Sequence, residues 1–106
     1  MRKPKRPRTA RRVSQRKLDK LVRDREKLAS LEPGGSPERP LEVTTASLVE
    51  PRALAHRCLR CDNASRLVDH DAVLHDDRLL RVVTLRCDRC SAERTLYFRV
   101  VAALLN

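Results

Sequence analysis

The chain has 106 residues, of which 24 are Lys or Arg and 14 are Asp or Glu, so its formal net charge is +10. It contains four Cys, two Gly, and one residue each of Tyr and Phe. This length is too short for the large sheet that frames the pocket of a Rossmann or barrel enzyme. A membrane-spanning helix needs about 20 apolar residues, whereas the longest apolar run, 100–105, has six.

The basic residues are concentrated in the first third of the chain. Residues 1–31 hold 13 Lys or Arg and three acidic residues, whereas 32–106 holds 11 Arg, 11 acidic residues and no Lys. Such asymmetry is typical of a basic arm that binds a polyanion. A solubilising tail is the alternative interpretation. No apolar stretch follows the first basic residues, so a secretory signal is not expected and the predicted compartment is a reducing cytoplasm.

Two elements are predicted within this basic region. Residues 1–13 are expected to form a disordered basic arm, because Pro4 and Pro7 stand among like charges that repel one another. Apolar residues then recur at spacings of three, four and seven, which is the period of one helix face. This pattern predicts an amphipathic basic helix over 14–31, which ends before a Pro-Gly-Gly sequence.

The middle of the chain is predicted to connect this helix to a small β domain. Residues 32–53 are interpreted as a Pro- and Gly-rich linker. Within it, 41–50 is rich in β-branched residues, which predicts an edge strand. Three strand-like runs follow, at 66–75, 79–86 and 95–101. A turn at Asp76-Asp77 is predicted to join the first two runs.

Four cysteines carry the clearest chemical signal. Cys58 and Cys61 form one Cys-x2-Cys pair, and Cys87 and Cys90 form an identical pair after an interval of 25 residues. Zinc prefers four soft donors at the corners of a tetrahedron, and a tight Cys-x2-Cys turn, or knuckle, directs two thiolates at one ion. Two strands joined by a short turn return the chain beside the first knuckle. Spacing and strand pattern therefore predict one structural Zn²⁺, with a closed shell of four thiolates.

This arrangement resembles the zinc-ribbon superfamily over about residues 54–101, and the predicted ribbon domain spans 54–103. The resemblance assigns the four cysteines to two facing knuckles and implies a three-stranded antiparallel zinc ribbon. The expected fold class is therefore a small metal-stabilised β domain preceded by a basic N-terminal α-helix. Family ribbons usually place Gly directly after the second Cys of a knuckle, where φ is positive, whereas this chain has Asp62 and Ser91.

Other uses of the cysteines remain as alternatives. A rubredoxin-like iron site also takes two Cys-x2-Cys pairs, although the aromatic-rich core of that family has little counterpart in a chain with two aromatic residues. Disulfides need an oxidising compartment. A thioredoxin-type redox pair needs a single Cys-x2-Cys beside a βαβ unit, and neither condition holds.

Arginines flank both cysteine pairs, at Arg57, Arg60, Arg86 and Arg89. They are expected to offset the net negative charge of a four-thiolate zinc site. The alternative is that Arg60 and Arg89, at matching positions in the two knuckle tips, face a phosphate backbone.

The remaining polar and apolar residues are given structural roles. His56, two residues before Cys58, is an alternative metal ligand that the four cysteines make redundant. The other histidines and the aspartates near the first strand are interpreted as surface residues: His70, His75, Asp69, Asp71, Asp76 and Asp77. Alternation along the strands predicts a core of Leu67, Val73, Leu80, Val82, Leu96, Phe98 and Val100. Tyr97 then faces the other side of the sheet, where it packs across strands or, alternatively, stacks on a base.

The sequence shows no nucleophile–base pair, no Gly-rich phosphate loop and no open metal position, so an enzyme is not expected. The predicted function is non-catalytic binding of DNA or RNA, mainly through phosphate contacts of the basic arm and helix, with no membrane or small-molecule partner. The predicted contacts are Arg2, Lys3, Lys5, Arg6, Arg8, Arg11, Arg12, Arg16, Lys17, Lys20, Arg60 and Arg89. The alternative is a protein-interaction adaptor that docks through the helix or the edge of the ribbon.

Overall fold

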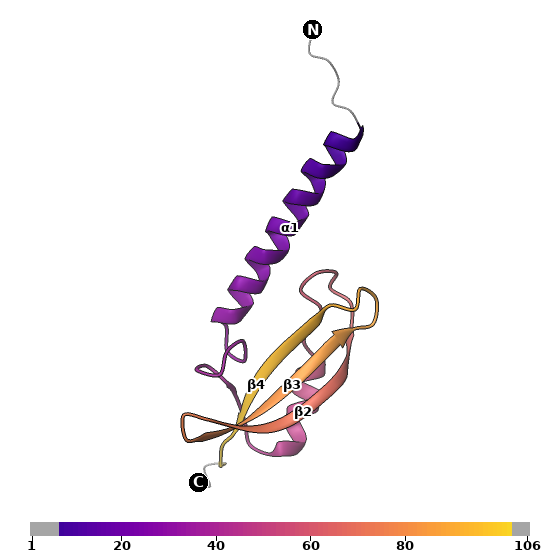
Figure 1. Ribbon diagram of the computed structural model, residues 1–106. Coiled ribbons are helices and arrows are strands. Elements are labelled where there is room, and N and C mark those ends of the chain that lie inside the picture. The colour runs from indigo at the N-terminus through magenta and orange to yellow at the C-terminus, as the bar shows by residue number, and fades with distance from the viewer. Residues whose placement is uncertain (1–6, 103–106) are drawn as a thin grey trace.

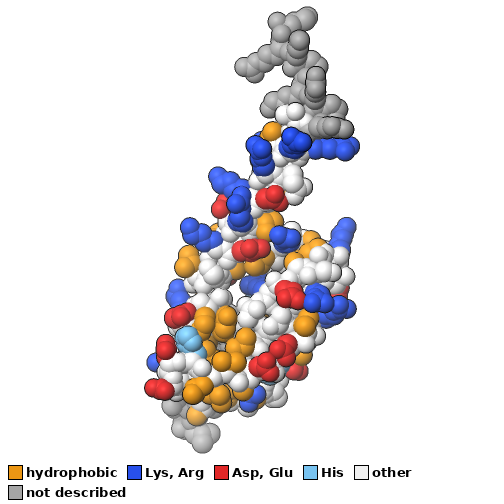
Figure 2. All heavy atoms as spheres, viewed as in Figure 1, with side chains coloured by type: hydrophobic (Ala, Val, Ile, Leu, Met, Phe, Trp, Pro, Cys, Tyr) orange, Lys and Arg blue, Asp and Glu red, His pale blue; other side chains and the backbone are white. Residues whose placement is uncertain are grey.

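The computed structural model describes residues 7–102, which form one long helix and a small β domain (Figure 1). The helix, α1 (Pro7–Leu31), projects away from the domain, and Lys and Arg side chains lie along it (Figure 2). The molecule is correspondingly elongated, with extents of 74 × 26 × 25 Å. Within the described residues, no helix is both long enough and apolar enough to cross a membrane.

The helix begins at Pro7, seven residues before the predicted start. Proline suits the first position of a helix, because its φ angle is already helical and the missing N–H has no intrahelical partner there. The residues that follow are mostly Arg and Ala, which are good helix formers. The boundary of the predicted arm at residue 13 is therefore corrected: its second half belongs to α1, and residues 1–6 lie outside the described residues.

The sheet has four strands, which corrects the expected three-stranded antiparallel ribbon. The strands are β1 (Leu41–Val43), β2 (Ser65–His75), β3 (Arg78–Cys87) and β4 (Glu93–Val100), in the order β1-β4-β3-β2. The three strands expected from the sequence do pair antiparallel. The added strand, β1, pairs in parallel with β4, with Leu41 opposite Phe98 and Val43 opposite Val100. The sheet is therefore mixed.

The predicted edge strand over 41–50 is only three residues long. After β1 the chain forms a short 3-10 helix, η1 (Ala46–Leu48), and then helix α2 (Val49–Leu54). Glu50 and Pro51 stand in the first turn of α2, where a carboxylate is stabilised by the helix dipole and the missing N–H of proline has no cost. Residues 41–54 therefore belong to the folded domain, and the linker interpretation is wrong for this part.

The turn between β2 and β3 agrees with the prediction. His75 pairs with Arg78, so Asp76 and Asp77 form a two-residue hairpin loop. Both aspartates have positive φ angles, 48° and 62°. Two successive positive φ values are the geometry of the hairpin turn that matches the twist of the flanking strands. Asp tolerates this geometry better than most residues.

The core lies between α2 and one face of the sheet. It consists of Val43, Val49, Ala53, Val83, Leu85, Leu96 and Phe98. Among the predicted core residues, Leu80, Leu96 and Phe98 are buried, and Leu67 packs against the core. Val82 is half-buried, whereas Val73 and Val100 are exposed. The prediction missed Val83 and Leu85, because β3 carries apolar residues on both faces and its alternation does not identify the buried one.

The loop between α1 and β1 is tied to β4. The N–H of Tyr97 donates to the carbonyl of Gly34 at 2.9 Å. Gly34 has a φ of 87°, and a Cβ at this position would lie 2.8 Å from Leu41. A Cβ at Gly35 would overlap the carbonyl of Ala29 in α1. The two glycines of the chain therefore stand where the base of α1 approaches the domain most closely.

Candidate metal centre

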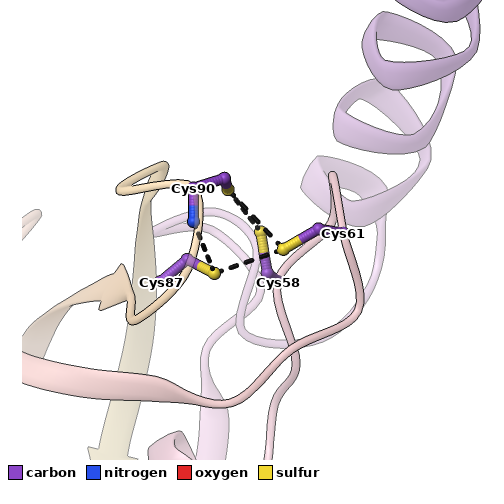
Figure 3. A group of neighbouring side chains, drawn as sticks. All are labelled: Cys58, Cys61, Cys87 and Cys90. Atoms are coloured by element: carbon purple, nitrogen blue, oxygen red, sulfur yellow. Dashed lines mark hydrogen bonds between the residues drawn. The ribbon is translucent and has the colours of Figure 1, made fainter.

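The two cysteine pairs lie at the end of the sheet nearest to α1 (Figure 3). Cys58 and Cys61 come from the loop between α2 and β2, Cys87 is the last residue of β3, and Cys90 lies in the loop before β4. The antiparallel pairing of β2 with β3 places Ser65 opposite Cys87. The hairpin therefore returns the second pair of cysteines beside the first, as the interval between the pairs predicts.

The four sulfur atoms form a compact cluster, in which all lie within 4.8 Å of one another. The Cys61 Sγ is 3.3 Å from the Cys87 Sγ and 3.6 Å from the Cys90 Sγ, and the Cys58 Sγ is 3.5 Å from the Cys90 Sγ. A tetrahedron with metal–sulfur bonds of about 2.3 Å has edges of about 3.8 Å. The cluster therefore has the size of a four-thiolate metal shell, and its cysteines are not joined in disulfides.

The two knuckles share the same backbone hydrogen bonds. In each, the N–H four residues after the first Cys donates to the carbonyl of that Cys, at 3.0 Å in the first knuckle and 3.2 Å in the second. The N–H of the first Cys donates to the carbonyl five residues later, at 3.0 Å and 2.9 Å. Asp62 and Ser91, where the zinc-ribbon resemblance predicts Gly, have φ angles of 60° and 63°. The knuckle geometry is therefore kept without Gly.

Backbone N–H groups point at the sulfurs of the first Cys in each knuckle. The N–H of Arg60 lies 3.4 Å from the Cys58 Sγ, and the N–H of Arg89 lies 3.4 Å from the Cys87 Sγ. The N–H of Cys90 also donates to the Cys87 Sγ, at 3.5 Å. These donors stabilise thiolates, which are the form of Cys that binds a metal.

The environments of the second cysteines of the two knuckles differ. Hydrogen bonds from the side chain and the backbone of Asn63, and then from Cys87, lower the pKa of Cys61 to about 6. At Cys90, the backbone N–H of Ala92 lowers the pKa, but burial and hydrogen bonds shared with the other three sulfurs raise it to about 11. In the absence of a cation, four thiolates this close repel one another, so the last protons are the hardest to remove.

The flanking arginines are held mainly by neighbours in the protein. The Arg57 side chain donates to the carbonyl of Asp62 at 3.2 Å, and Arg86 forms a 2.6 Å ion pair with Glu93. Arg60 lies 4.0 Å from Glu26 of α1. The side chain of Arg89 has no hydrogen bond or ion pair with residues in the described range. Arg94 was not predicted to be near the site, but its guanidinium donates to the carbonyl of Arg57 at 3.1 Å, and burial lowers its pKa.

The histidines do not join the cysteine cluster. The Nδ1 of His56 is 3.0 Å from the carbonyl of Arg52. The side chain of His70 is only 17% exposed, which corrects its interpretation as a surface residue, and its Nδ1 lies 3.1 Å from a carboxylate oxygen of Glu50 in α2. His75 lies beside the hairpin turn, 3.5 Å from Asp76 and 3.6 Å from Glu38.

The aspartates of the first hairpin strand are exposed. Asp71 shares a hydrogen bond with Asp69 and lies close to its negative charge, and both effects raise the pKa of Asp71. No group of three or more metal-binding side chains other than the four cysteines occurs within residues 7–102.

The predicted polyanion contacts are distributed between α1 and the knuckle tips. Five are exposed on the helix: Arg11, Arg12, Arg16, Lys17 and Lys20. Arg60 and Arg89 are exposed on the knuckles. Arg8 belongs to α1, and four lie outside the described residues: Arg2, Lys3, Lys5 and Arg6. The prediction omitted Arg23 and Lys27, which are also exposed on α1 and stand at helical spacing from Lys20.

Comparison of the chain with protein-family models, with curated proteins and with solved structures returns no match. The assignment of a function therefore depends on the cysteine cluster and on the distribution of charge.

Proposed function

We propose that the four cysteines hold one structural Zn²⁺. Thiolate sulfur is a soft donor that zinc accepts readily, and four protein ligands leave no coordination position for water or a substrate. The edge lengths of the sulfur cluster and the N–H donors to the sulfurs support this assignment. Iron takes the same four-sulfur geometry, and inductively coupled plasma mass spectrometry of the purified protein distinguishes the two metals.

We further propose that the protein binds nucleic acid, DNA or RNA, without catalysis. The observation that carries this proposal is the concentration of charge: residues 1–31 hold 13 of the 24 Lys and Arg residues. From Pro7 onward this segment is a helix that projects from the domain, and its basic side chains from Arg11 to Lys27 are exposed (Figure 2). Phosphate contacts made by such side chains release counterions and provide affinity with little sequence preference.

Deletion of residues 1–13 is expected to abolish most of the binding. The deletion removes seven basic residues, Arg2, Lys3, Lys5, Arg6, Arg8, Arg11 and Arg12. If the intact segment neutralises about eight phosphates of duplex DNA, a plot of log binding constant against log salt concentration has a slope of about −7. The slope should become much shallower in the truncated protein. Fluorescence anisotropy with labelled duplex and single-stranded oligonucleotides at several salt concentrations measures both quantities.

The metal content and the NMR spectrum of the sheet serve as controls for this truncation, because both should be unchanged. Full affinity together with an unchanged salt slope in the truncated protein would contradict the proposal. So would the absence of any salt-dependent binding by the intact protein at low salt.

A second candidate function is docking on a partner protein, and one observation favours it. Four leucines of α1 are 47–62% exposed: Leu18, Leu21, Leu28 and Leu31. An amphipathic helix can place such residues in the groove of a partner. Failure of the intact protein to bind nucleic acid at low salt would favour this second function.

A further inference from the structure

The length, exposure and charge pattern of α1 indicate whether it fits duplex or single-stranded nucleic acid. With 25 residues, α1 is about 37 Å long. Among residues 9–31, whose burial the structure describes, only Ala29 is buried, so the helix contacts the domain near its C-terminal end and is otherwise exposed (Figure 1).

The base of α1 is held by the first knuckle. The guanidinium of Arg25 donates to the carbonyl of Leu59 at 3.3 Å, and Leu59 lies between the two cysteines of that knuckle. Glu26 lies 4.0 Å from Arg60 in the same knuckle. Ala29 is buried one turn further along, where a side chain at Gly35 would overlap its carbonyl. The helix is therefore fixed at one end by the metal-binding loop.

Five basic residues form a line along α1, which we call the basic stripe: Arg12, Arg16, Lys20, Arg23 and Lys27. Their spacings are four, four, three and four residues, so they share one face of the helix. At about 100° per residue, they fall within an arc of about 80° and extend along about 22 Å of the axis. All five side chains are exposed.

The basic stripe lies outside the arc through which α1 contacts the first knuckle. Arg25 and Ala29 lie about 140–180° around the helix axis from the centre of the stripe, and Glu26 lies about 80° from it. Within the stripe, Arg23 lines a cavity with Glu26 and Arg60. The part of the stripe N-terminal to Arg23 therefore remains open. The stripe is a fixed linear array of positive charges on a rigid helix.

The chain lacks the aromatic surface that single-strand binding uses. Proteins that bind single strands usually stack successive bases on exposed aromatic side chains. Tyr97 and Phe98 are the only aromatic residues of the chain. Phe98 is fully buried, and Tyr97 is half-buried on the sheet, whereas α1 has none. A flexible strand would lose conformational freedom against the rigid stripe without stacking to compensate.

We infer that the ligand of the basic stripe is duplex nucleic acid, contacted through its phosphates and not through its bases. This inference rests on the proposed nucleic-acid function. A duplex presents phosphates in an order that is fixed before binding, with one negative charge per about 1.7 Å of its axis. That density counts both strands, so over the length of the stripe one strand presents about six phosphates. The narrow arc of the stripe suits contact along one phosphate ridge, with no side chain committed to reading base edges.

The first test compares duplex and single-stranded ligands. Anisotropy titrations use 20-nucleotide DNA as a duplex of mixed sequence and as each separated strand, together with an RNA duplex of the same sequence. We expect the full-length protein to bind the duplexes at least about tenfold more tightly than the strands, with little change on scrambling the sequence. Equal or tighter binding of the strands would contradict the inference while leaving the proposed function intact. Binding of no ligand would contradict the proposed function itself.

The second test uses a matched pair of variants. Arg16→Gln/Lys20→Gln removes two charges from the stripe, and Arg66→Gln/Arg78→Gln removes two charges from exposed positions on the β domain. Each lost phosphate contact makes the duplex salt slope shallower by about 0.9. We therefore expect the stripe variant to lose about 1.8 from the slope and at least about tenfold in affinity, and the control to lose less than about threefold. Equal losses from the two variants would show that net charge alone matters and would overturn the assignment to the stripe.

Comparison of the RNA and DNA duplexes shows whether the stripe contacts the phosphate ridge or enters a groove. An α-helix enters the major groove of B-form DNA, whereas the major groove of A-form RNA is too narrow for it. A contact confined to the phosphate ridge should accept both forms with affinities that differ by less than about fivefold. Binding of only one form would exclude a ridge contact of this kind.

Discussion

Replacing Cys87 with serine is expected to abolish metal binding and to unfold the sheet. Cys87 is 2% exposed, and its sulfur lies 3.3 Å from that of Cys61 and receives two backbone N–H groups. A serine hydroxyl is a poor substitute for a thiolate as a zinc ligand. Apparent binding energies of structural zinc are about 10–16 kcal/mol, which is comparable to the entire stability of a typical domain of about 5–15 kcal/mol. The loss of one ligand should therefore leave the domain unfolded at 25 °C.

NMR resonances of β2, β3 and β4 measure this effect, because helix α1 can keep its circular dichroism signal without the sheet. Inductively coupled plasma mass spectrometry measures the metal in the same samples. The control is Thr95→Ser, a similarly small change at an exposed position of β4, which should retain both metal and spectrum. A Cys87→Ser protein with a dispersed spectrum would contradict a structural role for the metal.

The second large effect is expected from Phe98→Ala, in protein that retains its metal. Phe98 is fully buried in the core between α2 and the sheet, beside Val83 and Leu96. Truncation of a buried Phe costs about 3–5 kcal/mol, because apolar contacts are lost and a cavity remains. A domain with so few buried side chains has little other core to compensate. Urea denaturation, followed by the NMR resonances of the sheet, should show a loss of free energy of unfolding of this size.

The matched control is Tyr97→Ala, which removes a ring of similar size from the next residue. Because alternate residues of a strand point to opposite faces, Tyr97 lies on the face that α2 does not cover, where it is half-buried. The Tyr97 variant should lose less than about half as much free energy of unfolding as the Phe98 variant. Equal losses would contradict the placement of the core on the α2 side of the sheet.

The cysteine spacing and the β2–β3 hairpin are the parts of the fold that sequence predicted best, and both depend on local chemistry. Two cysteines at a tight turn have few other geometries that use both thiolates. Asp76-Asp77 between two apolar runs is a local turn signal. The positive φ angles at Asp62 and Ser91 show that the knuckle requires the backbone conformation but not glycine itself.

The parts that sequence missed depend on contacts between distant segments. Nothing in the local sequence at Leu41–Val43 indicates that it pairs in parallel with Phe98–Val100. The β-branched residues nearby suggested a longer strand, but Glu50 and Pro51 favour the start of a helix. In β3, the choice between Val82 and Val83 as the buried residue is made by α2, which packs on only one face.

For the candidate site, the sequence likewise predicted the four cysteines but not the contacts that surround them. The four cysteines follow directly from their spacing. The attachment of α1 to the first knuckle, through Arg25 and the carbonyl of Leu59, joins residues 34 positions apart and has no sequence motif. The basic stripe does have a signal, the spacing of four, four, three and four residues, but it is recognisable only when the helix is known to extend back to Pro7.

The measurement that tests the central claim most directly is native mass spectrometry of the full-length protein, combined with NMR during titration of a strong chelator. Four thiolates around a single ion predict a mass that corresponds to one zinc per chain, with four protons displaced. They also predict that the dispersed resonances of the sheet disappear in proportion to the zinc removed and return when zinc is restored. A metal-free protein that keeps the same dispersed spectrum in excess chelator would contradict the claim.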